Sequence, residues 1–526
     1  MKYSHEDSLK MELTAKRMDL LSGGKKIIVL NNKDAEFFDL KPVDRVRIWH
    51  DHKSVIAIID ISEKFVKKGT AGCFEEVFKS LGLKEKDKIR VEPVPKPETV
   101  NLIKAKMQGR TLTSQEIDKI IKDVMEEKLS DIELTAFMTS VYIRGFNDAE
   151  TVSLTKSIVN SGTTLKLNKD IILDKHCIGG VPGNRTTMLL VPIIAGYGMT
   201  IPKTSSRAIT SPAGTADVME VLAPVSLKEE EIEEVVKKAN GCITWGGAVN
   251  LAAADDKLIR VRVPLGLDPP GVLLASIMAK KKAVGATHVL IDIPIGRGAK
   301  IPDEEKAKEL ARDFMEIGSQ LDMSIHCIIT PGYDPVGFAV GPAIEAREIL
   351  RILEGKRVST DLRDKAVIMS GKLLKMSGKT SQEEGEKAAE HLISSGKALE
   401  KLKEIIELQG GDPKVTSDDV QVGDKQVTVK AHKKGRIQYI NTRSITAIAR
   451  AAGAPKSKGA GVYMHVEKGD KLKRGQPLFT IYAESEQKID VALDVMNRMP
   501  PVEFEKVILE ELSTEEELKP YMLEFH

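Results

Sequence analysis

The sequence has 526 residues, of which 41% are apolar, 30% are charged and only 4% are aromatic, and its formal net charge is +2. This length predicts several domains, while the near-neutral charge and the few aromatic residues disfavour a nucleic-acid-binding surface. The chain shows no leader pattern and no apolar run of about 18 residues, so we expect a cytoplasmic protein without a membrane span. Cys73, Cys177, Cys242 and Cys327 are far apart, which predicts neither a CxxC metal site nor disulfides.

Short β-rich runs occupy the first part of the chain. From Lys25 to about Val94, runs such as KKIIVL, DRVRIWH and SVIAIIDI alternate with turn residues, a pattern typical of a small β domain. Pro93, Pro95 and Pro97 follow closely on one another and indicate a stiff linker. We therefore predict a β-rich N-terminal domain over residues 1–95.

Helix-start signals dominate the next segment. Three capping boxes precede apolar residues at helical spacing. They are Thr113 with Glu116, Ser130 with Glu133, and Asn147 with Glu150. This pattern predicts a helical domain over residues 96–165, joined by a later segment at about residues 250–285.

The sequence pattern changes again near Ile171. Strand-like runs such as DIILDKH and ATHVLIDIPI alternate with helical runs such as DEEKAKELARDFMEIG, which predicts an α/β domain over residues 166–415 with a central mixed sheet. After LQGGDPKV, short strands return, and we predict a C-terminal α+β domain over residues 416–526. The expected fold class is therefore multidomain α/β and α+β.

A glycine-rich loop lies between a strand and a helix in DKHCIGGVPGNRTTMLL, residues 174–190. This order directs backbone N–H groups and the helix dipole at an anion, and Lys175, Thr186 and Thr187 add to the favourable field. A phosphate group fits such a loop, and a plain glycine-rich turn is the alternative. Neither GxxxxGK[ST] nor GxGxxG is present, so the common nucleotide motifs give no support.

A second polar loop, TSSRAITSPAGTADVMEVL, spans residues 204–222. Its hydroxyl and cationic residues are Ser205, Ser206, Arg207, Thr210, Ser211 and Thr215. Two such loops predict two anionic groups or one enclosed anion. The alternative is a solvated Ser/Thr loop with one structural arginine.

Several motifs occur in a fixed order along the chain: KHCIGG, SSRAITSPAGT, NLAAADDKL, LLASIMAKK, LQGGDP and GDKLKRGQPLFTIYA. Together they resemble the thymidine and pyrimidine nucleoside phosphorylase family, from about residue 96 to the end. The closest likeness is to its archaeal branch, the AMP phosphorylases, which carry an additional N-terminal β domain. The sequence departs from the nucleoside enzymes at Cys177, Ser211 and Val261, where they have Ser, His and Arg, and this disfavours thymidine as the substrate.

The resemblance also implies the roles of individual residues. Orthophosphate would lie among Lys175, Cys177, Thr187, Ser205 and Thr215. AMP would contact Gly180, Ser206, Arg207, Ala208, Ile209, Thr210, Ser211, Thr215, Ser276 and Lys300. In GRGAK, Arg297 and Lys300 would be partners for a 5′-phosphate.

The acid–base residues have two interpretations each. Asp268, which Pro269 and Pro270 follow, would protonate the departing base according to the resemblance, and its alternative role is an N-cap for the next helix. His176 either orients phosphate or is a buried structural histidine. His50 and His52 share one side of a strand but have no third ligand nearby, so a structural role is favoured.

The resemblance implies a pentosyltransferase that converts AMP, and also CMP and UMP, with phosphate to free base and ribose 1,5-bisphosphate in nucleotide salvage. Inorganic phosphate would be a co-substrate, with no metal or other cofactor and no nucleic-acid or membrane partner. A homodimer or larger homo-oligomer is expected. The alternatives are a pyrimidine nucleoside phosphorylase, an anthranilate-type phosphoribosyltransferase that needs a metal and pyrophosphate, and a non-catalytic nucleotide sensor or RNA-binding protein.

Overall fold

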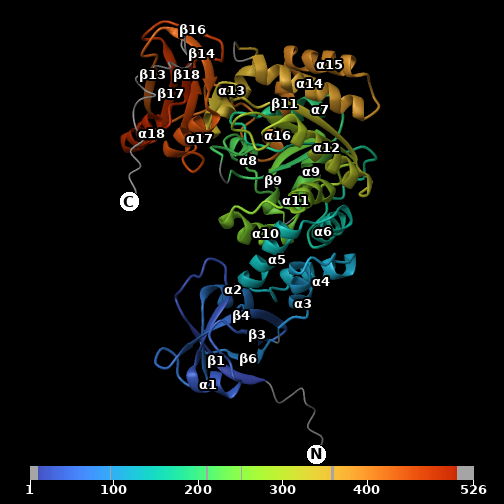
Figure 1. Cartoon of the computed structure of the whole chain (residues 1–526), viewed down its shortest axis with the longest axis vertical. Coiled ribbons are helices and arrows are strands. Elements are labelled where there is room, and N and C mark those ends of the chain that lie inside the picture. The colour runs from blue at the N-terminus through green and yellow to red at the C-terminus, as the bar shows by residue number, and fades with distance from the viewer. Residues whose placement is uncertain (1–9, 95, 209–210, 250, 357–359, 506–526) are drawn as a thin grey trace, which may run out of the picture. The chain divides into compact units, whose positions relative to one another are not determined.

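A computed structural model describes residues 10–94, 96–208, 211–249, 251–356 and 360–505. The chain divides into two compact units (Figure 1). Unit 1 consists of Met1–Ser157 with Ala254–Val272, and unit 2 consists of Ile158–Ala253 with Leu273–His526. Each unit is described by itself below.

Unit 1 begins with a closed six-stranded barrel, shown in blue in Figure 1. Its strand order is β1-β5-β2-β4-β3-β6. The strands are β1 (Met11–Arg17), β2 (Ile27–Asn31), β3 (Arg45–His50), β4 (Lys53–Ser62), β5 (Thr70–Cys73) and β6 (Lys88–Pro93), with helices α1 (Asn32–Phe37) and α2 (Glu75–Leu81). Inward residues such as Leu13, Ile28, Val46 and Ile59 are fully buried and form its core, because alternate residues of a barrel strand face inward. This barrel is the small N-terminal β domain of the expected fold class, and it belongs to the same compact unit as the helices that follow.

Helices make up the rest of unit 1. They are α3 (Thr99–Met107), α4 (Ser114–Met125), α5 (Asp131–Arg144), α6 (Asp148–Asn160) and α10 (Ala253–Arg262), with a short 3-10 turn η3 (Val263–Leu265). The capping boxes of Thr113 and Ser130 are both formed at the starts of α4 and α5. Asn147 and Glu150 exchange the same pair of hydrogen bonds ahead of α6. All three predicted helix starts are therefore confirmed.

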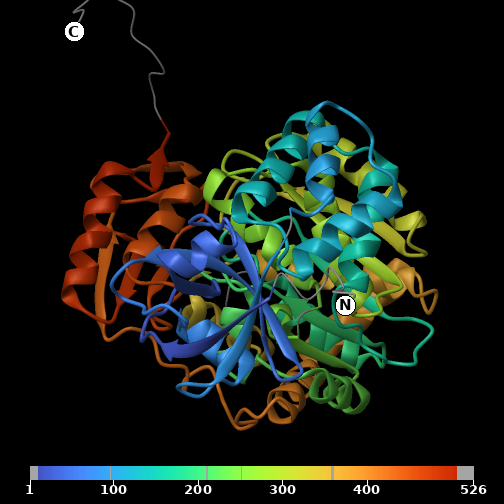
Figure 2. The same ribbon diagram turned by 90° about the horizontal axis from the view of Figure 1, so that it is seen from below.

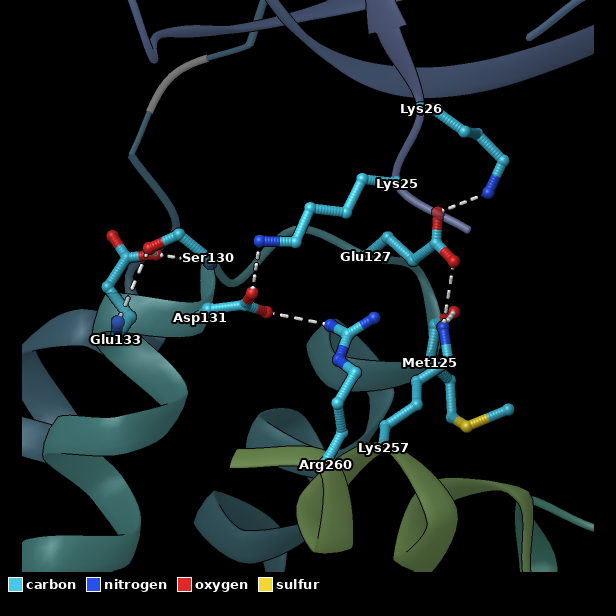
Figure 3. Close-up of polar contacts among 9 residues, drawn as sticks. All are labelled: Lys25, Lys26, Met125, Glu127, Ser130, Asp131, Glu133, Lys257 and Arg260. Carbon is cyan, nitrogen blue, oxygen red and sulfur yellow. Dashed lines mark hydrogen bonds and ion pairs between the residues drawn. The ribbon is translucent and has the colours of Figure 1, made fainter. Parts of the chain in front are cut away.

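An ion-pair network connects the barrel to these helices within unit 1 (Figure 3). Asp131 at the start of α5 bonds Lys25 at 2.8 Å and Arg260 of α10 at 2.7 Å. Glu127, in the loop between α4 and α5, likewise pairs with Lys26 and Lys257. Each carboxylate thus binds one lysine just before the barrel strand β2 and one cation of α10.

The sheet of unit 2 carries the first glycine loop. Strands β7 (Leu173–Cys177), β10 (His288–Ile295) and β11 (Ser324–Pro331) pair in the order β11-β10-β7, and β8 (Ile201–Ser205) pairs with β9 (Gly241–Trp245). An isolated bridge between Ile172 and Thr200 connects the two groups. All these pairings are parallel, whereas a mixed sheet was expected. The difference arises because each strand is linked to the next by a segment that contains a helix, which suits parallel neighbours.

Helices surround this sheet. They are α7 (Thr186–Gly196), α8 (Thr215–Met219), α9 (Glu229–Ala239), α11 (Pro270–Ala283), α12 (Glu304–Ser319), α13 (Pro342–Leu353), α14 (Thr360–Met376), α15 (Gln382–Ser394) and α16 (Lys397–Leu408), with the turn η2 (Gly246–Ala248). Helix α7 is buried along nearly its whole length, from Thr186 to Ala195, and packs against α14 and α16. It therefore lies at the centre of the largest core.

The C-terminal part of unit 2 contains short antiparallel strands and two helices, coloured orange and red in Figure 2. The strands are β12 (Ala339–Val340), β13 (Lys425–Lys430), β14 (Gly435–Ile440), β15 (Gly461–Met464), β16 (Lys471–Leu472), β17 (Pro477–Ala483) and β18 (Val502–Phe504), and the helices are α17 (Thr442–Ala451) and α18 (Glu486–Arg498). This α+β character agrees with the predicted fold class. Strand β12, from before α13, pairs with β15, so the C-terminal sheet is continuous with the earlier chain.

Two chemical expectations concern the whole chain. All four cysteines are free, and Cys73 and Cys242 are buried. No helix of the described residues is long and apolar enough to cross a bilayer.

Candidate active site

The first glycine loop connects β7 to α7 as the sequence predicts. Gly179, Gly180 and Gly183 all have positive φ angles, of +87°, +90° and +74°, and residues with a side chain adopt this conformation only with strain. A Cβ on Gly180 would lie 2.6 Å from the backbone nitrogen of Lys300. The loop and the GRGAK segment are therefore in direct contact, which brings together two of the predicted AMP-contacting positions.

One face of β7 carries a buried group of charges. Because alternate residues of a strand point to opposite faces, Asp174 and His176 share this face. Asp174 accepts a hydrogen bond from Lys281 of α11 at 2.6 Å and forms an ion pair with Lys203 of β8 at 3.4 Å. Burial, followed by the positive charges of Lys281 and Lys203, lowers the pKa of His176. This histidine is therefore neutral at physiological pH.

The opposite face of β7 carries a second group. Lys175 forms an ion pair with Asp292 of β10 at 3.4 Å, and Lys365 of α14 reaches the same carboxylate at 3.1 Å. Thr330 donates to Asp292 at 2.6 Å. Burial would raise the pKa of Asp292, but Lys175 and Lys365 outweigh it and set the pKa at about 2. Asp292 is therefore ionised, as a partner for two cations must be.

Cys177 adjoins this second group. The Asn184 amide donates to its Sγ at 3.4 Å and to Asp292 at 3.4 Å. Burial and the negative charge of Asp292 raise the pKa of the thiol despite Lys175. Cys177 is thus a neutral thiol, which suits a hydrogen-bonding role rather than a nucleophilic one.

Taken together, four lysines share two carboxylates around one strand. The side chains of Lys175, Lys203 and Lys281 are at most 6% exposed, and that of Lys365 is 14% exposed. Buried cations are costly unless paired, so this surplus of positive charge favours a bound anion. The sequence analysis missed Lys203, Lys281, Lys365, Asp174 and Asp292. The charged residues Asp174, Lys203 and Asp292 lie within buried strands, which was a usable signal, whereas Lys281 and Lys365 lie on helices.

The second polar loop is closed on itself by Asp217 of α8. Its carboxylate accepts hydrogen bonds from the backbone N–H of Ala208 at 2.7 Å and of Gly214 at 2.8 Å. A Cβ on Gly214 would approach the Ser206 carbonyl oxygen to 2.5 Å and the Ala208 nitrogen to 2.9 Å. The loop is thereby drawn into a tight turn that leads directly to Thr215, the first residue of α8.

Arg207 has a structural partner that the sequence did not suggest. Its guanidinium donates to Glu220 at 2.7 Å and stacks on Trp245, with 4.8 Å between the guanidinium carbon and the ring centroid. The hydrogen bond from Arg207, helped by Lys458, lowers the pKa of Glu220 to about 2. The positive charge of Arg207 is therefore already balanced within the loop.

The remaining predicted residues of this part are placed as follows. Thr187 is buried in the first turn of α7. Ser205 ends β8 and is partly buried, as are Ser211 and Thr215, while Ser206 is exposed. Lys300 is exposed and forms no ion pair with the described residues. Ile209 and Thr210 lie outside the described residues.

Ser276 and Lys280 lie one turn apart on α11, in unit 2. Lys280 approaches the Ser276 hydroxyl to 3.4 Å, as the spacing on the helix predicts. Asp268 belongs to unit 1, where it is 62% exposed and accepts a hydrogen bond from the buried Arg262. Among the described residues this carboxylate contacts no backbone N–H of α11, so the N-cap alternative has no hydrogen bond to support it.

The histidines outside the loops have ordinary surroundings. His50 lies 3.3 Å from Asp87 and 3.4 Å from the Leu81 carbonyl oxygen. No group of three or more His, Cys, Asp or Glu side chains suited to a metal ion occurs among the residues that the structure describes.

Comparison with known proteins identifies the family. The chain is 45% identical to AMP phosphorylase 1 of Archaeoglobus fulgidus over 93% of this chain and 96% of that protein. It is 44% identical to AMP phosphorylase of Thermococcus kodakarensis, over 95% of this chain and 99% of that protein. This chain belongs to the AMP phosphorylase family. The resemblance recognised from the sequence motifs is thereby confirmed.

Matches to individual domains agree with this membership. Residues 100–162 match the helical bundle domain of a glycosyl transferase family, and residues 169–399 match the a/b domain of that family. Residues 436–501 match the pyrimidine nucleoside phosphorylase C-terminal domain.

A solved structure shares the fold of part of the chain. Anthranilate phosphoribosyltransferase from Thermus thermophilus aligns with a TM-score of 0.50 at 20% identity, over 58% of this chain and 98% of that protein. This chain therefore shares part of its fold with an anthranilate phosphoribosyltransferase, which was one of the alternative functions. The family membership, with its much higher identity, does not favour that rival.

Proposed function

We propose that this chain is a nucleoside 5′-monophosphate phosphorylase. It converts AMP and orthophosphate to adenine and ribose 1,5-bisphosphate, and it accepts CMP and UMP in the same way. The relatives with this family name support the assignment of the reaction. The observation that carries it is the surplus of buried lysine charge beside the glycine loop, because that surplus calls for an anion in the ligand-bound enzyme.

Orthophosphate is assigned to the ends of β7 and β8. The assigned residues are Lys175 and Cys177 of β7, Thr187 of α7, Ser205 at the end of β8 and Thr215 at the start of α8. Dianionic phosphate there would stabilise the positive charge that develops on the sugar as the N-glycosidic bond breaks. The lysines would in turn hold the phosphate in place.

The 5′-phosphate of the nucleotide is assigned to Lys300 and Gly180. Lys300 is an exposed cation without an ion-pair partner among the described residues, and its backbone adjoins Gly180. Arg207 is a weaker candidate, because Glu220 already balances its charge. We assign Arg207 the role of shaping the loop that carries Ser206, Ala208, Ile209, Thr210 and Ser211. Ser276 completes the nucleotide contacts from α11.

Asp268 is assigned as the general acid that protonates the departing base. In the described structure its carboxylate accepts a hydrogen bond from Arg262. An acid must carry a proton before it can donate one, and the Oδ2 atom would carry it while Oδ1 accepts from Arg262.

The decisive experiment identifies the products. The protein is incubated with AMP and phosphate in the presence of a metal chelator, and adenine and the sugar product are identified. Ribose 1,5-bisphosphate supports the proposal. Dependence on magnesium and pyrophosphate would indicate a phosphoribosyltransferase, and AMP binding without adenine release would indicate a sensor. With adenosine in place of AMP, kcat/KM should fall by about 10-fold to 150-fold for the loss of each charge-assisted bond.

The role of Asp268 has its own test. Asp268→Asn should lower kcat with AMP by about 10² to 10⁴ while leaving AMP binding nearly unchanged, because general-acid catalysis contributes that much to a rate. Near-normal turnover by this variant would remove Asp268 from the mechanism.

The remaining expectations belong to the same proposal. We propose that the enzyme needs no cofactor besides inorganic phosphate, acts in nucleotide salvage in the cytoplasm and forms a homodimer or larger homo-oligomer. Size-exclusion chromatography with light scattering tests the last of these.

A further inference from the structure

Asp174 has one negative charge and two ammonium partners. Lys281 lies 2.6 Å from its Oδ2 atom, and Lys203 lies 3.4 Å from its Oδ1 atom. The side chain of Asp174 is 0% exposed, and those of Lys281 and Lys203 are 3% and 6% exposed. Water therefore does not solvate the surplus charge, and a neighbouring group must balance it or one lysine must lose its proton.

Apart from Asp174, the described groups of β7 and α11 do not supply a negative charge that would balance Lys203. His176 is neutral, because burial and the lysines lower its pKa. Lys175, which shares Asp292 with Lys365, adds a positive charge from β7 that also acts on His176. The electrostatic surroundings on this side thus increase the surplus.

The other elements that pack against β8 are neutral toward it. Burial raises the pKa of Cys242 on β9 to about 12, so this thiol carries no charge. Helix α7 contains no charged residue, and the buried face of α9 consists of Ile232, Val235, Val236 and Ala239. Asp217 of α8 is occupied by Arg207 and by backbone N–H groups.

Lys203 loses its proton more easily than Lys281 does. It is farther from Asp174 than Lys281 is, and it donates a hydrogen bond to the Thr204 carbonyl oxygen at 2.8 Å. Burial lowers the pKa of Lys203, Asp174 offsets only part of this effect, and the pKa lies at about 7. Strand β8 ends only two residues later at Ser205, one of the residues assigned to phosphate.

We propose that Lys203 is a positioning residue of the phosphate site that takes up a proton from solvent when orthophosphate binds. The inference rests on the proposed function, since it needs an anion at the ends of β7 and β8. The neutral amine becomes an ammonium, and the bound anion supplies the negative charge that the buried group lacks. No bond to substrate forms or breaks at Lys203.

The sign of the pH effect follows from linkage. A bound anion favours the ammonium, so the pKa of Lys203 is higher in the complex than in the free enzyme. Phosphate binding is then strongest below about pH 7, where Lys203 already carries its proton, and weakens as the pH rises. The effect ends above the pKa of the complex, where Lys203 is neutral in both states.

The first measurement uses the unaltered protein and sulfate, a tetrahedral dianion that does not titrate near neutral pH as orthophosphate does. Sulfate binding is followed by calorimetry in buffers of different ionisation enthalpy, which gives the number of protons taken up. We expect a fraction of one proton at about pH 7.5 and much less at about pH 5.5, where Lys203 is already protonated. Sulfate binding without proton uptake between these values overturns the proposal.

The second measurement compares Lys203→Met with the unaltered enzyme. The ratio of their KM values for phosphate is compared at each pH, because the protonation of phosphate itself affects both values equally. The variant should bind phosphate about tenfold more weakly at about pH 6 and within about twofold at about pH 9, because only a charged lysine attracts the anion. Lys282→Met is the matched control, since Lys282 lies on α11 and donates to the Leu321 carbonyl oxygen instead. A ratio that stays constant with pH overturns the proposal.

Two features keep the test independent of folding and of the assigned reaction. If Lys203→Met fails to fold, Lys203→Arg takes its place, because arginine keeps a permanent charge. Above about pH 7 the phosphate affinity of Lys203→Arg should change only as far as the titration of phosphate itself changes it. Sulfate calorimetry needs no turnover. If AMP is not cleaved but sulfate binds with proton uptake, the proposed function fails and the role of Lys203 at an anion site stands.

Discussion

Two polar clusters in this protein each have two carboxylates and four cations, but their surroundings differ. In unit 1, Asp131 and Glu127 are each shared by two cations (Figure 3). In unit 2, Asp174 and Asp292 are each shared by two lysines. Asp131 is 37% exposed and its partners Lys25 and Arg260 are about half exposed, whereas Asp174 is 0% exposed.

Burial decides what the surplus charge means. Around Asp131, water and salt ions balance the charge of the second cation, so the cluster has only a small effect on the free energy of unfolding. Around Asp174 and Asp292, the protein must balance it by removing a proton from a lysine or by binding an anion. The exposed cluster therefore connects structural elements, while the buried cluster indicates a ligand site.

The largest expected difference follows from removal of the shared carboxylate. Asp174→Asn leaves Lys203 and Lys281 buried without a counter-charge and should lower the free energy of unfolding of unit 2 by about 3–5 kcal/mol. Asp131→Asn should lower that of unit 1 by about 1 kcal/mol or less. Urea unfolding followed by tryptophan fluorescence measures both.

The chain offers a separate reporter for each unit. Its two tryptophans are Trp49 on barrel strand β3 and Trp245 at the end of β9, so Trp245→Phe and Trp49→Phe backgrounds follow units 1 and 2 respectively. Equal losses for Asp174→Asn and Asp131→Asn would show that burial does not separate the two clusters.

The next effect concerns phosphate. Lys175→Met removes a buried cation assigned to the anion and should raise the KM for phosphate by about 10-fold to 150-fold, the equivalent of one charge-assisted hydrogen bond. Asp292 keeps Lys365 as its partner, so the variant should fold. Lys257→Met, in the exposed cluster, is the control and should leave this KM within about twofold. An unchanged KM for Lys175→Met would exclude the buried cluster from the phosphate site.

The sequence alone predicted the features that depend on residues close together along the chain. The capping boxes of Thr113 and Ser130 predicted helix starts because a cap involves residues only three positions apart. The glycine loop after β7 was recognisable for the same reason. Strand order was not, and the parallel sheet replaced the expected mixed one.

Partners that are distant in sequence could not be predicted. Asp174 meets Lys281, which is 107 residues away, and the sequence contains no short-range trace of that contact. The resemblance implied that Arg207 contacts AMP, with a structural arginine as the alternative, and its ion pair with Glu220, 13 residues later, was not predicted. Long-range pairs of charges depend on the folded topology, so they appear only in the structure.

A smaller effect is expected for Lys365, which the sequence analysis did not single out. Its ammonium lies 3.1 Å from Asp292 and 3.1 Å from the Thr330 hydroxyl. Lys365→Met should raise the KM for phosphate by about tenfold or less, because Lys175, and not Lys365, is assigned as a direct partner of the anion. Lys26→Met is the control from the exposed cluster. A larger loss for Lys365→Met than for Lys175→Met would make Lys365 the principal phosphate ligand.

The smallest effect is the response of the exposed cluster to salt. At about 1 M ionic strength the screening length falls to about 3 Å, so the pairs of Lys25 and Lys26 with their carboxylates should lose most of their contribution, up to about 1 kcal/mol in total. The double variant Lys25→Met, Lys26→Met should already lack it, and its unfolding, reported by Trp49, should depend less on salt than that of the unaltered chain. Unit 2, reported by Trp245, should show no such difference between the two chains, because neither lysine belongs to it. An equal salt dependence of unit 1 in both chains would mean that the pairs of Lys25 and Lys26 do not stabilise unit 1.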